Sequence, residues 1–246
     1  MSSLLSPPTK PSSHLSTELS LVSSSIPSCR TLASTPDFLT LKITHTKYRA
    51  LHVTFTFPET YPHVNLVVTV DTQGVKGSLS IPPNLKKLLE RELAEVLALH
   101  PPPPPPSESS PPVRVPPPTK ATSQLFSCVH HLSTFLSTNL FFPCWKELRT
   151  LTSFLTTSTS PTFTPTIQTS TTTGRILITL TSPPYHYNFS LKVDPGYPDT
   201  QSNLVDPAGA TVKCTGSNLP AFLVVIVTAQ AQEVLRRCFQ GERGGV

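Results

Sequence analysis

The residues best suited to chemistry in this sequence are five cysteines, spread widely along its 246 residues. No two of them have the Cys-x-x-Cys spacing, so the sequence encodes neither a zinc ribbon nor a RING-type zinc module. Their odd number and wide separation favour reduced, mostly buried thiols in an intracellular protein. They are Cys29, Cys128, Cys144, Cys214 and Cys238.

The histidine and aspartate side chains form no recognisable metal or catalytic motif. His130 and His131 are adjacent, so they cannot lie on one helix face as ligands of one metal ion. Asp194, Asp199 and Asp206 lack the spacing of an EF-hand calcium loop. No glycine-rich phosphate loop, Gly-x-Ser-x-Gly or His-Glu-x-x-His segment occurs. We therefore expect no catalytic residue, no metal site, no cofactor and no small-molecule ligand.

A proline-rich corner that follows an alternating strand occurs twice in the chain. The first corner comes after residues 51–57, and the second comes after residues 187–193. Proline cannot donate a backbone hydrogen bond to a sheet, so it ends the strand and turns the chain. Two copies of one corner predict two copies of one domain. The corner residues are Pro58, Tyr61 and Pro62 in the first copy, and Asp194, Pro195, Tyr197 and Pro198 in the second.

Each corner belongs to a predicted antiparallel meander. Apolar and polar residues alternate along the strands, which is typical of a sheet with one covered face. The expected fold class is α+β, with the meander sheets packed on helices. The predicted strands are 38–43, 51–57 and 66–70 in the first copy, and 175–180, 187–193 and, more weakly, 210–214 in the second.

Apolar residues at helical spacing predict the helices. A short helix at 14–23 would place Leu15, Leu19 and Val22 on one face. The apolar run 222–227 is ambiguous between strand and helix. A long helix is predicted from Gln124 to Phe142, with a restart at Trp145. The remaining predicted helices are 85–97 and 230–239.

The composition predicts that part of the chain does not pack into a core. Hydrophobic residues make up only 37% and charged residues 13%, whereas there are 29 prolines and many serines and threonines. We expect a first domain at 14–142 with a proline-rich insertion at 100–122. The second domain is expected at 143–240, with a Ser/Thr-rich connection at 156–173, and the tails are 1–13 and 241–246.

Charge and hydropathy argue against nucleic acid and membrane as partners. The net charge of +5 is scattered, whereas nucleic-acid binders concentrate positive charge on one face. No run approaches the 18 or so consecutive apolar residues of a transmembrane helix. The first residues lack the basic start and apolar core of a signal peptide. We therefore expect a soluble, intracellular protein.

Ubiquitin-conjugating enzymes share the plan of a meander followed by a proline corner. They need an activated cysteine after the third strand and an asparagine that steadies the oxyanion. No His-Pro-Asn segment follows either corner. Cys128 lies within a predicted helix stripe, and Cys144 lies in the apolar segment Phe-Phe-Pro-Cys-Trp, which would raise the pKa of its thiol. The sequence therefore predicts a binding protein and not a conjugating enzyme.

The order of a helix, a meander, a Tyr-Pro corner and further helices is that of the RWD domain, a non-catalytic relative of the conjugating fold. Two such units in tandem resemble the central double-RWD region of the FANCL family, the ubiquitin ligase subunit of the Fanconi anaemia core complex. The resemblance rests on short stretches, of which the corner is the most specific. They are 38–43 with 51–62, 124–151, 174–180 with 188–195, and 193–198.

The resemblance implies a nuclear protein, with the cytoplasm as a further location. It would bind the Fanconi substrate pair and core-complex subunits, and position the pair for monoubiquitination in interstrand cross-link repair. Trp145 and Leu148 lie in a matching turn and, with Tyr197 and Pro198, are the expected partner-binding residues. Pro58, Tyr61, Pro62, Asp194 and Pro195 are expected to have structural roles.

The family also ends in a RING domain, and no zinc framework occurs up to Val246. We therefore expect this chain not to catalyse ubiquitin transfer on its own. Two other interpretations remain. One is a non-catalytic RWD adaptor, of kinetochore type or of another scaffold, and the other is an active conjugating enzyme.

Overall fold

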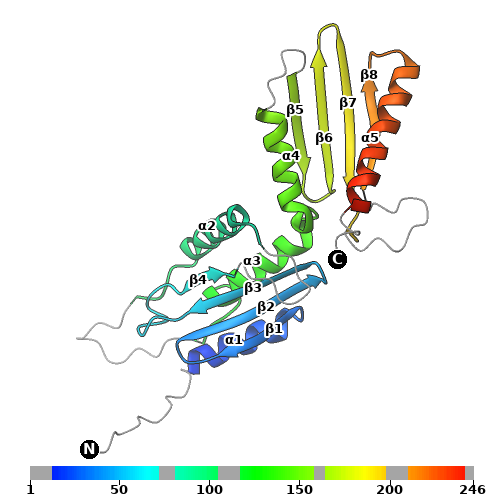
Figure 1. Ribbon diagram of the computed structural model, residues 1–246. Coiled ribbons are helices and arrows are strands. Elements are labelled where there is room, and N and C mark those ends of the chain that lie inside the picture. The colour runs from blue at the N-terminus through cyan, green and yellow to red at the C-terminus, as the bar shows by residue number, and fades with distance from the viewer. Residues whose placement is uncertain (1–12, 72–80, 105–116, 158–163, 198–209, 242–246) are drawn as a thin grey trace, which may run out of the picture. The chain divides into compact units, whose positions relative to one another are not determined.

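The computed structural model describes residues 13–71, 81–104, 117–157, 164–197 and 210–241. The chain divides into two compact units, Met1–Ser137 and Thr138–Val246. Each unit contains one four-stranded antiparallel sheet together with helices (Figure 1). The predicted α+β class and the antiparallel meanders are therefore confirmed. The units divide after Ser137, whereas the sequence placed the domain boundary after Phe142. The position after Phe142 lies inside a short 3-10 helix, Phe142–Cys144, of the second unit.

The first unit is a simple meander whose strands are neighbours in the order β1-β2-β3-β4. Strands β2 and β3 pair so that Leu39 lies opposite Phe55 and Leu41 lies opposite Val53. All four of these side chains are buried. The elements are α1 (Ser13–Ser25), β1 (Cys29–Ser34), β2 (Phe38–Thr46), β3 (Arg49–Thr56), β4 (Val67–Val70), α2 (Pro83–Leu99) and α3 (Gln124–Thr138).

The helices of the first unit bury the stripes that their sequences predict. Along α2, a buried leucine recurs every four residues from Leu85 to Leu97. Helix α1 buries Leu15 and Val22, but the residue between them that is fully buried is Glu18, and Leu19 is half-buried. The opposite face of the sheet is polar, and there the hydroxyls of Thr40 and Thr54 are hydrogen-bonded at 3.1 Å. One covered face and one polar face are typical of an antiparallel sheet.

The second unit repeats the arrangement, with strands in the order β5-β6-β7-β8. Helix α4 lies along β5, and α5 lies along β8 (Figure 1). Ile176 of β6 lies opposite Leu191 of β7, and Ile178 lies opposite Phe189. The elements are η1 (Phe142–Cys144), α4 (Trp145–Thr157), β5 (Thr164–Ser170), β6 (Arg175–Ser182), β7 (Tyr185–Val193), β8 (Ala210–Ser217) and α5 (Ala221–Gly241).

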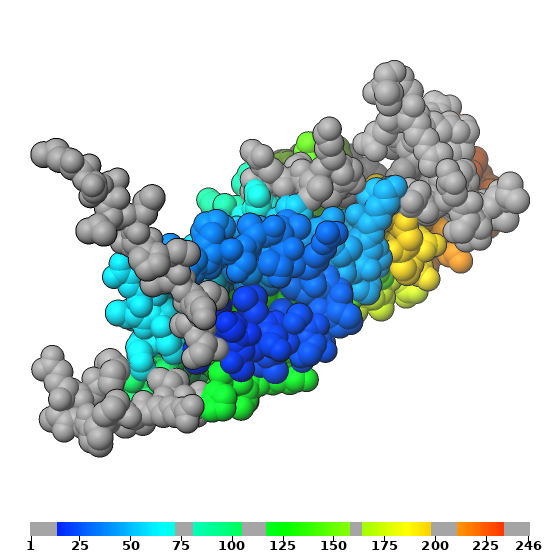
Figure 2. Space-filling model, turned by 90° about the horizontal axis from the view of Figure 1, so that it is seen from below, coloured from blue at the N-terminus to red at the C-terminus, as the bar shows by residue number. Residues whose placement is uncertain are grey.

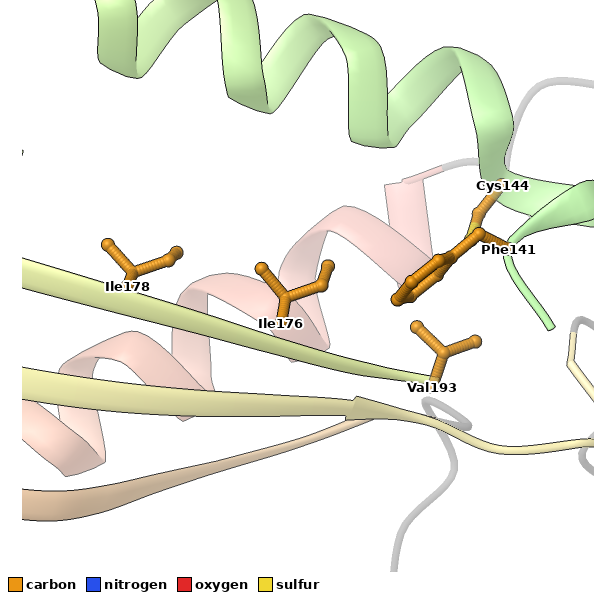
Figure 3. Close-up of a cluster of buried hydrophobic side chains, with 5 residues drawn as sticks. All are labelled: Phe141, Cys144, Ile176, Ile178 and Val193. Carbon is orange, nitrogen blue, oxygen red and sulfur yellow. The ribbon is translucent and has the colours of Figure 1, made fainter. Parts of the chain in front are cut away.

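The core of the second unit forms between α4 and the sheet. Phe141 is fully buried and lies beside Cys144 and Val193, while Ile176 and Ile178 extend from β6 toward α4 (Figure 3). Partly buried apolar residues complete this core, which joins the helix to three strands. They are Leu148, Leu151, Leu155, Ile167, Leu180, Phe189, Leu191 and Tyr197.

Several elements correct the sequence-based expectations. Strand β1 was not predicted, because it is an edge strand whose residues are mostly exposed and do not alternate. The connection expected at 156–173 contains strand β5, whose Ile167 packs against the core. Helix α3 ends at Thr138, short of Phe142, because the Asn139 carboxamide accepts a hydrogen bond from the Phe141 N–H at 3.1 Å and turns the chain. The ambiguous run 222–227 belongs to the single helix α5.

The two corners share one backbone turn. The Tyr61 N–H donates to the Pro58 carbonyl at 2.8 Å, and the Tyr197 N–H donates to the Asp194 carbonyl at 3.0 Å. Each turn therefore starts one or two residues after its strand ends and closes three residues later on a tyrosine. In the second corner the Gly196 N–H also donates to the Asp194 carboxylate at 3.2 Å. Pro198, the insertion residues 105–116 and the outer parts of both tails lie outside the described residues.

Gly174 closes the turn between β5 and β6 with a positive φ of 62°. A Cβ atom at this position would lie 2.6 Å from the Val193 carbonyl oxygen, which belongs to backbone and cannot rotate away. We expect Gly174→Ala to lower the free energy of unfolding by about 1–3 kcal/mol, because left-handed backbone strain and this clash add together. Urea unfolding followed by circular dichroism measures the loss. Equal stability of Gly174→Ala and the wild type would contradict this geometry.

Candidate functional site

The first unit buries a carboxylate, that of Glu18, which is 0% exposed. Helix α1 holds it inward because Glu18 lies three residues after Leu15 and four before Val22, both of which are in the core. The Tyr61 hydroxyl donates to Glu18 Oε2 at 2.5 Å, and the Ser123 hydroxyl donates to Oε1 at 2.6 Å. One side chain therefore connects helix α1, the first corner and the start of helix α3.

Ser123 and Gln124 continue this network at the start of α3. The Ser123 hydroxyl oxygen also accepts the Phe126 N–H at 3.0 Å, which is the hydrogen bond of a helix N-cap. The buried Gln124 Nε2 donates to Asn65 Oδ1 at 2.7 Å and to the His100 carbonyl at 2.8 Å. In Figure 2 the dark blue surface of α1 accordingly lies next to the green surface of α3. Buried polar contacts thus join the first corner to the end of α2 and to helices α1 and α3.

A pocket of about 400 Å³ lies beside this network. Its walls include the proline residues 101–103, 117 and 118 together with Pro62, and its polar lining includes His14, Glu18 and Tyr61. The His14 ring packs edge-on against the Tyr61 ring, with 5.8 Å between their centroids. His14 Nδ1 is buried 3.8 Å from Glu18 Oε2, and within the described residues no atom is hydrogen-bonded to it.

The environments of three thiols are unsuited to nucleophilic catalysis. Burial raises the pKa of the Cys128 thiol to about 12, and the nearby Glu18 carboxylate raises it as well. Burial and the neighbouring Glu147 raise the pKa of the Cys144 thiol to about 12. Burial alone raises the pKa of Cys29 to about 11. A catalytic cysteine needs a lowered pKa, so these three thiols stay protonated and unreactive at neutral pH.

We expect Cys128 and Cys144 to react with iodoacetamide at pH 8 about a hundredfold or more slowly in the native protein than in urea, because thiolate is the reacting form and burial disfavours it. Both rates should rise with pH, since the thiolate fraction grows toward the pKa. Peptide mass spectrometry after timed quenching gives the rate at each cysteine. Alkylation of native Cys144 at the rate of an unfolded thiol would contradict the buried environment.

The residues predicted to bind a partner lie largely in the second core. Leu148 faces the sheet from α4, and Tyr197 packs on the same cluster from the corner, so the fold brings these two together. Trp145 is half-buried at the start of α4, and its Nε1 is buried without a hydrogen-bond partner among the described residues. Pro198 lies outside the described residues. Of the predicted structural residues, Pro58 and Tyr61 form the first turn, and Asp194 with Pro195 forms the second.

An exposed apolar face occurs instead on helix α5. Phe222, Val225 and Ile226 are exposed to 64%, 67% and 47%, and their spacing places them on one side of the helix. We call these three residues the α5 face. The other side of this helix packs on the sheet, where Thr228 is hydrogen-bonded to the Tyr187 hydroxyl at 2.6 Å. The signal in the sequence was the continuous apolar run 222–227, since a helix that is apolar all round cannot bury every side against one sheet.

Comparison of the chain with models of protein families, with curated proteins and with solved structures finds no match in any of the three. Among the described residues, no helix combines the length and the apolar character needed to cross a membrane.

Proposed function

We propose that this chain is a non-catalytic protein-interaction scaffold, and specifically the substrate-binding double-RWD part of a FANCL-like ubiquitin ligase. The observation that carries the proposal is the repeat of one plan in two compact units. Each unit has a helix, then a four-stranded antiparallel meander with a tyrosine-ended turn after its third strand, and then closing helices, which are α2 and α3 in the first unit and α5 in the second. Two units of this order are what the resemblance to that family leads one to expect, and this agreement supports the proposal.

The state of three of the five thiols supports a binding role over conjugating activity. Thioester formation requires a thiolate, and the raised pKa values of Cys29, Cys128 and Cys144 disfavour it. The proposed role is therefore to hold the Fanconi substrate pair while a RING domain recruits the conjugating enzyme. Mass spectrometry after incubation with charged activating enzyme provides the check, and a ubiquitin thioester on any cysteine would overturn the non-catalytic part of the proposal.

The α5 face is the proposed contact surface. Large apolar side chains that are exposed together on one helix face are typical of binding hot spots, whereas an isolated exposed residue is common and carries no such meaning. Along the described side chains of α5, from Ala221 to Glu233, the only charged residue is Glu233. An apolar partner surface therefore meets little charge that must be desolvated on binding.

The test measures binding of the purified chain to the purified Fanconi substrate pair by biolayer interferometry. We expect Val225→Glu to weaken binding about tenfold or more, because it places a charge at the centre of the apolar face. Thr172→Glu is the matched control: it introduces the same charge on an exposed turn of the same unit and should leave binding unchanged. A folded wild-type chain that binds kinetochore subunits but not the Fanconi pair would overturn the proposal in favour of an adaptor.

A further inference from the structure

We propose that the outward face of the first sheet docks a protein segment that carries acidic side chains and, about 13 Å from them, a bulky apolar side chain. The proposal goes beyond the scaffold function, because it concerns the first unit alone and not the α5 face. We call this surface the outward sheet face, and it consists of the side chains of β1–β4 that point away from the buried core. Its members in the argument are Arg30, Phe38, Thr40, Lys42, His52, Thr54 and Val67.

One row of this face brings cations together across three strands. Arg30 of β1 lies directly opposite Lys42 of β2, and Lys42 lies opposite His52 of β3. Opposed side chains on one face have Cβ atoms roughly 4.5–5.5 Å apart, and like charges at this separation repel each other. Burial, and then Lys42, lower the pKa of His52, although Asp71 opposes the shift, so His52 is largely neutral at neutral pH. The permanent charges of the row are therefore those of Arg30 and Lys42.

Arg30 and Lys42 have no acidic partner among the described residues, since no ion pair is formed with either of them. The four strands contain no aspartate or glutamate. Asp71 follows β4 and lies two strands away from Lys42, which is about 9–10 Å between backbones. Residues 1–12 and 72–80 lie outside the described residues, and their sequence contains lysines but no acidic residue. An acidic group from a partner would therefore relieve the repulsion in this row.

A second row of the same face is apolar. Phe38 of β2 and Val67 of β4 both pair with the last residue of β3, and they are 38% and 55% exposed. Phe38 precedes Lys42 by four residues on one strand, so the two rows lie about 13 Å apart. Between them, the hydroxyls of Thr40 and Thr54 are hydrogen-bonded to each other at 3.1 Å. The outward sheet face thus has cations at one end and exposed apolar side chains at the other.

This pattern favours a protein segment over a nucleic acid as the occupant. Nucleic acids carry a phosphate at every nucleotide, and proteins that bind single strands stack successive bases on several aromatic rings. Among the residues of the outward sheet face, Phe38 alone is a phenylalanine, tyrosine or tryptophan, and the permanent charges lie at one end. A segment with acidic residues and an apolar anchor matches both ends, because opposite charges guide the encounter and the anchor adds contact area.

The probe is the acetylated and amidated peptide Glu-Asp-Glu-Ser-Thr-Ser-Leu-Phe, whose last acid precedes the first apolar residue by four positions. Titration of the full ¹⁵N-labelled chain up to millimolar peptide should give saturable ¹H–¹⁵N NMR shifts at Arg30, Phe38, Lys42 and Val67. Added salt should weaken the binding, because it screens exposed charges. Two matched peptides, one with amides in place of the acids and one with serines in place of Leu-Phe, should bind about fivefold or more weakly.

Lys42→Glu should weaken binding of the probe about tenfold or more, because it reverses the charge at the centre of the row. Lys87→Glu is the matched control, which makes the same change at an exposed position of α2 and should alter the affinity by no more than about twofold. If Lys42→Glu does not fold, Arg30→Glu on the exposed edge strand takes its place.

Equal binding by Lys42→Glu and Lys87→Glu, or the absence of saturable shifts at the outward sheet face, would overturn the proposal. Tighter binding of a short oligouridylate than of the acidic peptide would overturn it in favour of a nucleic acid. Val225→Glu on the α5 face should leave binding of the probe unchanged. Failure of this proposal is therefore distinguishable from failure of the scaffold function.

Discussion

Replacement of Glu18 by alanine is expected to destabilise the first unit by about 2–5 kcal/mol, because it leaves two hydroxyl donors without an acceptor in the interior. The donors are those of Tyr61 and Ser123, at 2.5 and 2.6 Å from the carboxylate. The change also removes the bonds that join α1 to the corner and to α3. Urea unfolding of the full chain, followed by circular dichroism, measures the lost free energy.

Two comparisons separate the buried network from a general effect of losing a glutamate. Glu95 is an acidic residue on α2 whose side chain is 71% exposed and 3.9 Å from Arg91. Glu95→Ala should change stability by less than about 0.5 kcal/mol, as is usual for exposed ion pairs. A double-mutant cycle of Glu18→Ala with Ser123→Ala should show coupling of about 1 kcal/mol or more. If Glu18→Ala lowered the free energy of unfolding no more than Glu95→Ala does, the Glu18 carboxylate would not stabilise the first unit.

Replacement of Phe141 by alanine is expected to destabilise the second unit by about 3–5 kcal/mol, the usual loss for a large aromatic side chain in a core. Phe141 is fully buried and packs with Cys144 and Val193 where α4 meets the sheet (Figure 3). The cavity left behind lies between helix and strands and cannot be filled without moving one of them. Native-state hydrogen exchange should show the loss of protection in β6 and β7.

The matched control is Phe154→Ala, which removes the same side chain from α4 at a position that is 64% exposed. Its effect should stay within about 0.5 kcal/mol, because surface substitutions away from packed features are nearly neutral. If both variants lost the same free energy of unfolding, the burial of Phe141 would not contribute to the stability of the second unit. Unchanged protection in β6 and β7 with Phe141→Ala would likewise contradict the core described here.

Periodicity predicted the strands and helices whose two sides differ in chemistry. Strands β2 and β3 alternate in burial because one side of each faces a core, and α2 repeats leucine every four residues for the same reason. In β6 and β7 apolar and polar residue types alternate in the sequence. Strands β1 and β5 were not predicted because they bury little. Every residue of β1 after Cys29 is exposed, and β5 is a Ser/Thr-rich segment with one large apolar residue, Ile167.

The candidate sites were harder to predict than the fold. Helical spacing made Leu19 a core residue of α1, whereas the fold buries Glu18 at the adjacent position. A buried acid is favourable only with donors nearby, and its donors lie 43 and 105 residues away in the chain. No local pattern could show that these three side chains meet. The α5 face could not be predicted for the same reason, because the sequence does not show which side of an apolar helix the sheet covers.

The sequence by itself determined the two proline corners, the meanders that contain them and the duplication of one plan. These follow from local chemistry, since proline fixes a backbone dihedral and alternation sets which side of a strand is buried. Only the tertiary structure decided that Glu18 joins helix α1 to Tyr61 and Ser123, that a pocket opens beside it, and that Leu148 and Tyr197 pack inward. Such contacts join residues distant in the chain, and their energy depends on burial that a sequence pattern does not contain.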